Sequence, residues 1–238
     1  MINLSLVKGK LYLIPVTLGG NDVRAVIPDK VIETTKGLRY FVVEDIRSAR
    51  RYLKLVCKGF PLDETRFLEL NEHTPDEDMA NYLDPALNGS DMGLLSEAGM
   101  PAIADPGSKL IALAHRKTIS VVPLSGPSSI LLALVSSGLN GQEFVFHGYL
   151  PVKPADRAAK LKELERNAGR GYSQIFMEAP YRNNRMLDTI LSVCRNDTLL
   201  CIAADLTLPT EFIRTMKVSE WKRSRPDLNR RPAVYIMQ

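Results

Sequence analysis

Residues 93–134, GLLSEAGMPAIADPGSKLIALAHRKTISVVPLSGPSSILLAL, decide the fold of this chain. A short apolar run at 93–95 ends in a loop of small residues at 96–107, and a helix is expected to follow. A second apolar run at 119–124 ends in the turn Ser-Gly-Pro-Ser-Ser at 125–129, which opens another helix. Strand, loop and helix in this alternation predict parallel strands joined by crossover helices.

Both loops rich in Gly, Ser and Pro follow a strand, and ligands of parallel sheets bind outside the carboxyl ends of the strands. Small residues let a ligand approach the peptide groups, and glycine adopts backbone angles that other residues avoid. Glycine and proline also mark ordinary turns. Because two such loops are spaced as a βαβ pair, we expect them to line one ligand-binding crevice.

The composition of the 238 residues is that of an ordinary globular protein, with 45% hydrophobic and 24% charged residues. The net charge of +4 permits an anionic partner but does not demonstrate one. Three cysteines without a CxxC pair and three dispersed histidines predict neither a disulfide framework nor a metal site. No apolar run reaches the ~18 residues of a membrane span, and no signal-peptide pattern is present. We therefore expect a cytoplasmic protein without a membrane segment.

The first half contains two more strands that end in polar residues. The strand at 39–43 ends at Glu44 and Asp45, and a helix carrying Arg47 follows. The alternative is that this acidic pair only favours the helix dipole and pairs with Arg47. The strand at 67–70 leads into Asn71 and Glu72, and a helix is expected over 74–83, where a threonine, a proline and acidic residues form a start signal.

Two features complete the pattern of the chain. A strand at 11–14 ends in a glycine-containing loop at 15–22, which matches neither a dinucleotide nor an ATP fingerprint. A basic, helix-rich segment at 153–170 precedes strands at 172–177, 198–204, 212–216 and 233–237. We place the domain boundary near residue 124, which gives an N-terminal α/β domain at 1–124 and a C-terminal α/β domain at 125–238.

Several motifs, taken in order, resemble those of the tetrapyrrole methylase superfamily, the class III S-adenosylmethionine-dependent methyltransferases. They are LYLIPVTLGG at 11–20, VEDIR at 43–47, LNE at 70–72, LLSEAGMPAIADPG at 94–107, VVPLSGPSS at 121–129, GYLP at 148–151 and MEAPYRN at 177–183. The chain looks most like the branch that methylates a ribose 2′-hydroxyl of small-subunit ribosomal RNA. The resemblance implies two αβα domains, the first with a mostly parallel and the second with a mixed sheet, and S-adenosyl-L-methionine in the cleft between them. It also implies a homodimer that acts on ribosomal RNA or the small ribosomal subunit.

Carried over by motif, the resemblance implies roles for particular residues. The cofactor contacts would be Pro15, Gly99, Met100, Pro101, Ala102, Ile103, Ser129, Ile130, Met177, Ala179, Pro232 and Ala233. If the methyl acceptor is a ribose hydroxyl, a general base helps the reaction, and the candidates are Asp45, then Glu72, then Glu44. The candidates for substrate binding are Thr17, Arg47 and Asn71. Arg47 would hold a substrate phosphate.

Two other functions stay open at this point. A methylase of the same superfamily that acts on a tetrapyrrole or another small molecule would need a large apolar pocket with few basic residues at its mouth. A cofactor-binding protein without catalytic activity is the second, because the loops at Thr17 and Met100 depart from the usual family pattern.

Overall fold

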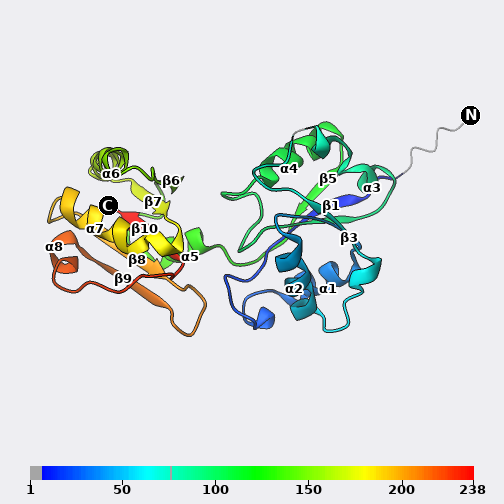
Figure 1. Cartoon of the computed structure of the whole chain (residues 1–238), viewed down its shortest axis with the longest axis horizontal. Coiled ribbons are helices and arrows are strands. Elements are labelled where there is room, and N and C mark those ends of the chain that lie inside the picture. The colour runs from blue at the N-terminus through cyan, green and yellow to red at the C-terminus, as the bar shows by residue number, and fades with distance from the viewer. Residues whose placement is uncertain (1–6, 76) are drawn as a thin grey trace, which may run out of the picture. The chain divides into compact units, whose positions relative to one another are not determined.

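The computed structural model describes residues 7–75 and 77–238, which form two units (Figure 1). The first unit ends at Ser128, and the second is Ser129–Gln238. Each unit contains its own five-stranded sheet. The predicted fold class, two αβα domains of which the first has a parallel and the second a mixed sheet, is confirmed.

Unit 1 is built from βα repeats. Its strands are β1 (Lys10–Ile14), β2 (Tyr40–Val43), β3 (Arg66–Glu69), β4 (Met92–Leu95) and β5 (Ser120–Pro123), in the sheet order β3-β2-β4-β1-β5. Every neighbouring pair is parallel. The carboxyl ends of all five strands therefore meet at one edge of the sheet.

Helices cover both faces of this sheet (Figure 1). On one face, α1 (Asp29–Gly37) and α2 (Ile46–Val56) pack with Ile14 and Phe41 in one hydrophobic core. On the other face, α3 (Asp84–Leu87) and α4 (Gly107–Arg116) pack with Leu11 and Met92 in a second core. The alternation of side chains along a strand explains why neighbouring strand residues enter different cores.

The expected helix over 74–83 is wrong. The structure has a turn, the 3-10 helix η3 (Asp78–Asn81) and then the single-turn α3 in this region, while residue 76 lies outside the described residues. Thr74 does not cap a helix here; its hydroxyl accepts a hydrogen bond from the backbone N–H of Asn71 (3.0 Å). Pro85 further limits a continuous helix because a proline nitrogen cannot donate to the preceding turn. Two smaller 3-10 helices, η1 (Val23–Ala25) and η2 (Leu62–Glu64), lie in other connections of unit 1.

Unit 2 has a mixed sheet in the order β6-β7-β10-β8-β9. Its strands are β6 (Phe144–Tyr149), β7 (Ser173–Met177), β8 (Leu199–Ala204), β9 (Phe212–Lys217) and β10 (Ala233–Met237). Only β6 and β7 are parallel; β10 enters between β7 and β8 and is antiparallel to both. The last strand of the chain therefore occupies the centre of the sheet, and all its residues are buried.

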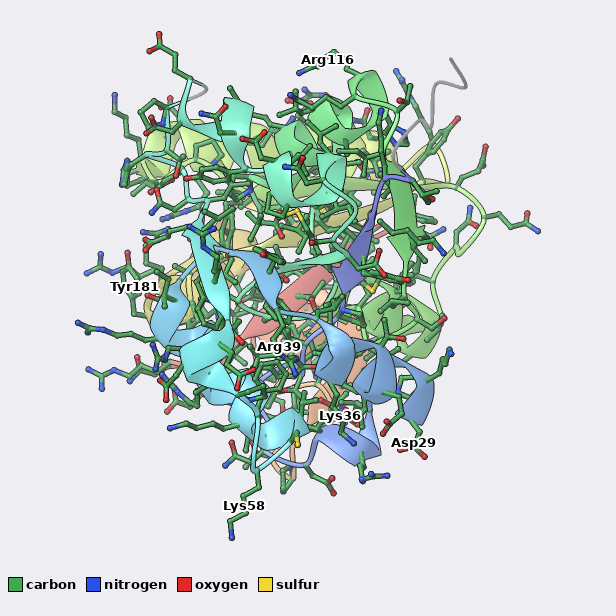
Figure 2. All side chains as sticks on the ribbon, turned by 90° about the vertical axis from the view of Figure 1, so that its right-hand side faces the viewer. Asp29, Lys36, Arg39, Lys58, Arg116 and Tyr181 are labelled. Atoms are coloured by element: carbon green, nitrogen blue, oxygen red, sulfur yellow. The ribbon has the colours of Figure 1, made fainter. Side chains whose placement is uncertain are left out.

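The helices of unit 2 also form two layers. The helices α6 (Pro154–Ala168), α7 (Asn183–Val193) and α8 (Val218–Trp221) share one core with Phe176, Trp221 and Tyr235. The helix α5 (Ser129–Ser137) packs against β8, β9 and β10, and its residues are not part of that core. Charged side chains such as Lys58 and Arg116 extend from the surface of the protein (Figure 2).

Candidate functional site

A polar pocket of about 530 Å³ lies at the carboxyl edge of the sheet in unit 1. Its lining residues follow three adjacent parallel strands: β2, β3 and β4. They are Glu44, Asn71, Glu72, His73, Ala104, Asp105 and Pro106. The structure thus brings together three of the candidates from the sequence, Glu44, Asn71 and Glu72, and adds Asp105.

Glu44 is the half-buried carboxylate of this pocket. Burial, and then the nearby charge of Asp105, raise the pKa of its carboxyl group, while a hydrogen bond from the backbone of Glu97 partly opposes the shift. A carboxylate with a raised pKa is a stronger base than one in water. Position and basicity make Glu44 suited to accept a proton from a bound ligand.

Asp45 has a different role in the fold. It is the N-cap residue of α2, and its carboxylate accepts a hydrogen bond from the backbone N–H of Ser48 (2.7 Å). Hydrogen bonds from Ser48 lower the pKa of the Asp45 carboxyl group, so it is a weaker base than Glu44. Asp45 is not among the residues that line the pocket.

The residues after β3 are more exposed. Glu72 and His73 form an exposed pair, with 3.5 Å between Oε1 and Nε2 and with both side chains 84% exposed. The Asn71 amide donates to Glu69 Oε1 (3.0 Å), and its oxygen accepts from the backbone N–H of His73 (2.9 Å). Asn71 is therefore fixed in orientation, whereas Glu72 is hydrated.

The loop that follows β4 is folded around the carboxylate of Asp105. This carboxylate accepts hydrogen bonds from the backbone N–H groups of Ala102 (2.8 Å) and Gly107 (2.8 Å). Ala102 has φ = 66° and Ala104 has φ = 61°, left-handed angles that cost about 1–2 kcal/mol for a residue with a Cβ atom. Backbone strain of this kind is concentrated at ligand-binding and catalytic sites.

The loops after β1, β4 and β5 touch one another. The backbone N–H of Val16 donates to the carbonyl of Gly99 (2.9 Å), and the hydroxyl of Tyr52 donates to the carbonyl of Pro15 (2.9 Å). A Cβ atom on Gly126 would lie 2.3 Å from the ring of Pro15. Glycine is therefore required at residue 126, where the backbone passes directly against the first loop.

Gly99 shows why the loop after β4 contains glycine. Its φ is +71°, and an added Cβ would lie 3.1 Å from Leu18 and 3.3 Å from the carbonyl of Pro127. The two small-residue loops therefore lie side by side, and the loop after β1 joins them, while the ligand-binding crevice expected between them stays a prediction.

Two candidates for substrate binding lie outside the pocket lining. Thr17 is 9% exposed, and its hydroxyl donates to the carbonyl of Gly20 (2.8 Å), so it closes the first loop on itself. Arg47 is exposed on the first turn of α2.

In unit 2, four of the cofactor candidates gather around the amino end of β10. Val234 pairs with Met177 at the end of β7, which puts Met177 and Ala179 beside Pro232 and Ala233. Ser129 and Ile130 form the first turn of α5, where Ile130 is buried.

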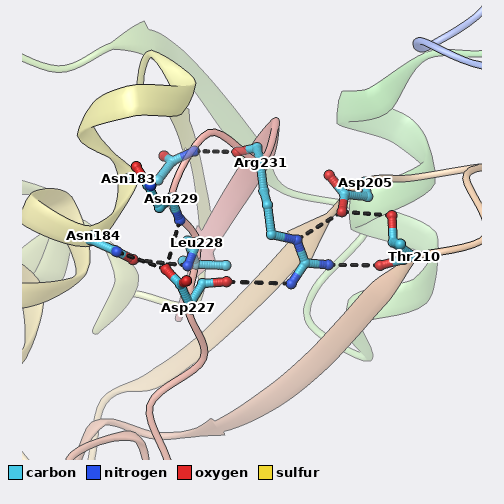
Figure 3. A network of polar contacts seen from close by, with 8 residues as sticks. All are labelled: Asn183, Asn184, Asp205, Thr210, Asp227, Leu228, Asn229 and Arg231. Carbon is cyan, nitrogen blue, oxygen red and sulfur yellow. Dashed lines mark hydrogen bonds and ion pairs between the residues drawn. The ribbon is translucent and has the colours of Figure 1, made fainter.

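A polar network holds the segment before β10 (Figure 3). The guanidinium of Arg231 donates to Asp205 (2.7 Å) and to the carbonyl of Thr210 (2.7 Å). The amide of Asn183 donates to the carbonyl of Arg231 (2.6 Å), and the backbone N–H of Asp205 donates to the carbonyl of Pro232 (2.9 Å). Two segments that are distant in sequence, at residue 183 and at 205–210, therefore fix the backbone at residues 231–232.

An ion pair between Glu178 and Arg182 lies just after the end of β7. The side chain of Glu178 is fully buried, and its Oε1 accepts hydrogen bonds from Arg182 Nη2 (2.6 Å) and Nε (2.9 Å). The other oxygen, Oε2, is buried and has no hydrogen-bond partner within the described part of the chain. Oε1 also accepts a hydrogen bond from the backbone N–H of Ala179 (2.7 Å), so Arg182 and this N–H together offset the cost of burying the charge.

Sequence reasoning missed Asp105, Glu178, Asp205 and Arg231. Asp105 had a local signal, since an aspartate two residues before a glycine in a loop commonly accepts backbone hydrogen bonds. Asp205 and Arg231 lie in different loops of unit 2, and no local pattern pairs them. Within residues 7–75 and 77–238, no cluster of three or more metal-ligating side chains occurs, and no helix is long and apolar enough to span a membrane.

A polar pocket at the carboxyl edge of a parallel sheet, beside a strained loop of small residues, defines an α/β enzyme with a ligand site in this unit. Residues 24–222 match the family model of the Tetrapyrrole (Corrin/Porphyrin) Methylases. The chain belongs to this family of methyltransferases.

Individual proteins that resemble this chain in sequence or in fold are methyltransferases too. The chain is 30% identical over 211 residues to "Ribosomal RNA small subunit methyltransferase I" of Vibrio cholerae, which covers 88% of this chain and 69% of that protein. It is 31% identical over 212 residues to the protein of the same name from Streptococcus pyogenes serotype M6, covering 89% and 70%. The crystal structure of the methyltransferase CobJ has the same fold, with a TM-score of 0.65, 16% identity and coverage of 96% and 93%.

Proposed function

We propose that this protein transfers a methyl group from S-adenosyl-L-methionine to a ribose 2′-hydroxyl of small-subunit ribosomal RNA. The names of the relatives support the RNA substrate. The main support for this chemistry is the position and pKa of Glu44. Its half-buried carboxyl group has a raised pKa and lines the pocket beside the loop after β4, where it can act as a base. We also propose that the protein is cytoplasmic, because an enzyme that acts on the small ribosomal subunit must reach it there.

The loop at 96–107 fits the cofactor. It contains no lysine or arginine, so it does not repel a sulfonium cation. Its Ile103 is 45% exposed, an apolar side chain that a ligand would cover. Bound S-adenosyl-L-methionine supplies an electrophilic methyl group on a positively charged sulfur. We propose that Gly99, Met100, Pro101, Ala102 and Ile103 contact it, together with Pro15.

Residues of unit 2 complete the proposed set of cofactor contacts. They are Ser129, Ile130, Met177, Ala179, Pro232 and Ala233. The network around Arg231 supports this role, because it fixes the backbone of Pro232.

Glu44 is the proposed general base. Its carboxylate accepts the proton of the ribose hydroxyl as the oxygen–methyl bond forms and the methyl–sulfur bond breaks. A positioned general base contributes about 10²–10⁴-fold to the rate. We place Glu44 ahead of Glu72, which is hydrated, and of Asp45, whose carboxylate caps α2. Asn71, fixed in orientation, would position the substrate, and Arg47 would bind a phosphate from the surface of α2.

Methyl transfer from labelled S-adenosyl-L-methionine tests the substrate directly. The acceptors are isolated small ribosomal subunits, naked small-subunit RNA and a tetrapyrrole precursor. We expect label in ribosomal RNA, on a ribose that resists alkaline cleavage at its 3′ side. Label in the tetrapyrrole alone would contradict the proposal; the carboxylates in the pocket lining argue against that substrate.

We also propose that the protein is a homodimer. The exposed apolar residues Leu131 and Val135 on α5, 52% and 79% exposed, support this. Light scattering of the purified protein tests it, and a monomer at micromolar concentration would contradict it.

A further inference from the structure

Two sequence motifs, GYLP at 148–151 and MEAPYRN at 177–183, carry exposed tyrosines that the proposed chemistry does not use. Tyr149 is 57% exposed and Tyr181 is 67% exposed. Exposed aromatic rings cost free energy in water unless a partner covers them. With Arg182 they form what we call the tyrosine patch of unit 2, and Figure 2 marks the position of Tyr181.

Tyr149 is placed by a local irregularity of the sheet. The pairing of β6 with β7 shifts register between Phe146 and Tyr149, and Gly148 in this bulge has φ = +65°. Tyr149 is then the partner of Met177, so both residues lie at the carboxyl ends of parallel strands. Bulges of this kind re-aim a side chain and are common next to active sites.

Tyr181 is held by Arg182. The guanidinium lies 5.0 Å from the centre of the Tyr181 ring, and its Nη1 donates a hydrogen bond to the tyrosine hydroxyl (2.7 Å). The buried Glu178 in turn fixes the guanidinium through two hydrogen bonds. The hydrogen bond to Glu178 raises the pKa of Arg182, so the guanidinium beside the Tyr181 ring stays charged.

Three exposed cationic side chains lie near the tyrosine patch, two of them close in sequence and one through a backbone hydrogen bond. Lys153 lies four residues beyond Tyr149, Arg185 lies one helical turn beyond Tyr181, and the backbone N–H of Arg230 donates to the carbonyl of Pro180 (3.0 Å). All three side chains are exposed, and none forms an ion pair with another described residue. Their charge is therefore available to an anionic ligand.

We propose that the tyrosine patch binds single-stranded RNA, with bases stacked on Tyr149 and Tyr181 and with phosphates bound by Lys153, Arg185 and Arg230. Aromatic rings interleaved with cations are the usual platform for single-stranded nucleic acid, because every base has a face that stacks and every nucleotide carries a phosphate. The inference rests on the proposed RNA substrate and assigns a second contact to it, outside the pocket of unit 1.

Fluorescence anisotropy with a labelled single-stranded oligouridylate and with small-subunit RNA tests the patch. Tyr149→Ala and Tyr181→Ala should each weaken binding about tenfold, whereas the phenylalanine variants, which keep the stacking face, should remain within about twofold. Tyr172→Ala is the matched control, since Tyr172 is 39% exposed but lies before β7, at its opposite end. Removing Arg230 should also reduce the salt dependence of binding.

Titration of S-adenosyl-L-methionine and light scattering accompany each variant. Unchanged RNA affinity in both alanine variants would overturn the inference even if methyl transfer to ribosomal RNA is found. A change of oligomeric state in place of RNA affinity would overturn it too and would assign the patch to a second copy of the chain. Loss of RNA affinity with cofactor binding intact would support it, even if the methylated position proves not to be a ribose hydroxyl.

Discussion

The two units of this protein have the same number of strands in each sheet, but they differ in how the loops beside the strands are held in place. In unit 1, the pocket is lined by residues from the three connections that follow β2, β3 and β4. In unit 2, the backbone near Pro232 is held by hydrogen bonds to Asn183 and Asp205, which come from two other segments of the chain (Figure 3).

This difference follows from strand direction. A parallel sheet brings all carboxyl ends to one edge, so a local pattern of strand and polar residue already specifies the position of a site. In the mixed sheet of unit 2 the last strand lies in the centre, and hydrogen bonds from residues distant in sequence hold the segment that leads into it. Variants in unit 1 should therefore affect chemistry, whereas variants of the network in unit 2 should affect stability first.

The largest effect is expected for Glu44→Gln. Loss of the general base should lower kcat by about 10²–10⁴-fold, with cofactor affinity unchanged. Because burial raises the pKa of Glu44, the folded state favours its protonated form, and that stabilisation is lost as pH rises through the raised pKa. Glutamine mimics the protonated form, so the variant should be at least as stable as the wild type at pH 7. Thermal unfolding and single-turnover methyl transfer check both points.

Asp63→Asn is the control for this variant, since Asp63 is an exposed carboxylate in η2, which precedes β3. It should retain the wild-type kcat. A full loss of activity in Asp45→Asn with a normal rate in Glu44→Gln would instead make Asp45 the base.

The next effect is expected in the network of unit 2. Arg231→Ala leaves Asp205, whose side chain is 9% exposed, without its cation, and should lower the free energy of unfolding by about 3 kcal/mol. The matched variant Arg225→Ala removes an exposed ion pair with Asp188, 51% and 57% exposed, and should cost no more than about 1 kcal/mol. Urea unfolding measures both, and equal losses would contradict a structural role for the network.

A smaller effect is expected for Asp105→Ala. The variant removes the acceptor for the N–H groups of Ala102 and Gly107, which hold the loop in its left-handed conformation. Cofactor affinity should fall about tenfold, because the two N–H groups lose the half-buried carboxylate that accepts their hydrogen bonds. Isothermal titration with S-adenosyl-L-methionine measures it, and unchanged affinity would show that the loop does not form the cofactor site.

The smallest effect is expected for Ala102→Gly. Glycine removes the strain at φ = 66° but adds entropy to the unfolded chain, so the free energy of unfolding should change by less than about 1 kcal/mol. Ala98→Gly, in the same loop but without a positive φ, should be the less stable of the two. The reverse order in chemical denaturation would contradict the role of backbone strain.

Much of the fold was predictable because apolar runs and small-residue turns alternate regularly. The strands at 93–95 and 119–124 and the loops between them were predicted within a few residues of β4 and β5. The helix over 74–83 was wrong because Thr74 forms a local turn with Asn71, a competition that the start signal does not reveal. The central position of β10 was not predictable either, since it depends on pairing with strands far away in sequence.

The position of the candidate site was predictable from the sequence, but the carboxylate that serves best as a base was not. Glu44 and Asp45 are adjacent in sequence, and the sequence ranks Asp45 first and Glu44 third as the general base, yet burial raises the pKa of Glu44 and a helix cap lowers the pKa of Asp45. Only the structure separates them, because burial and capping depend on which way each side chain points.

The pH dependence of single-turnover methyl transfer tests the central claim most directly. If Glu44 is the base, the rate of the wild type should rise with pH through the raised pKa of this carboxyl group and then level off. In Glu44→Gln the remaining slow rate should not show this step. The same step in wild type and variant would contradict the assignment of Glu44 and, with it, the role of the pocket in unit 1.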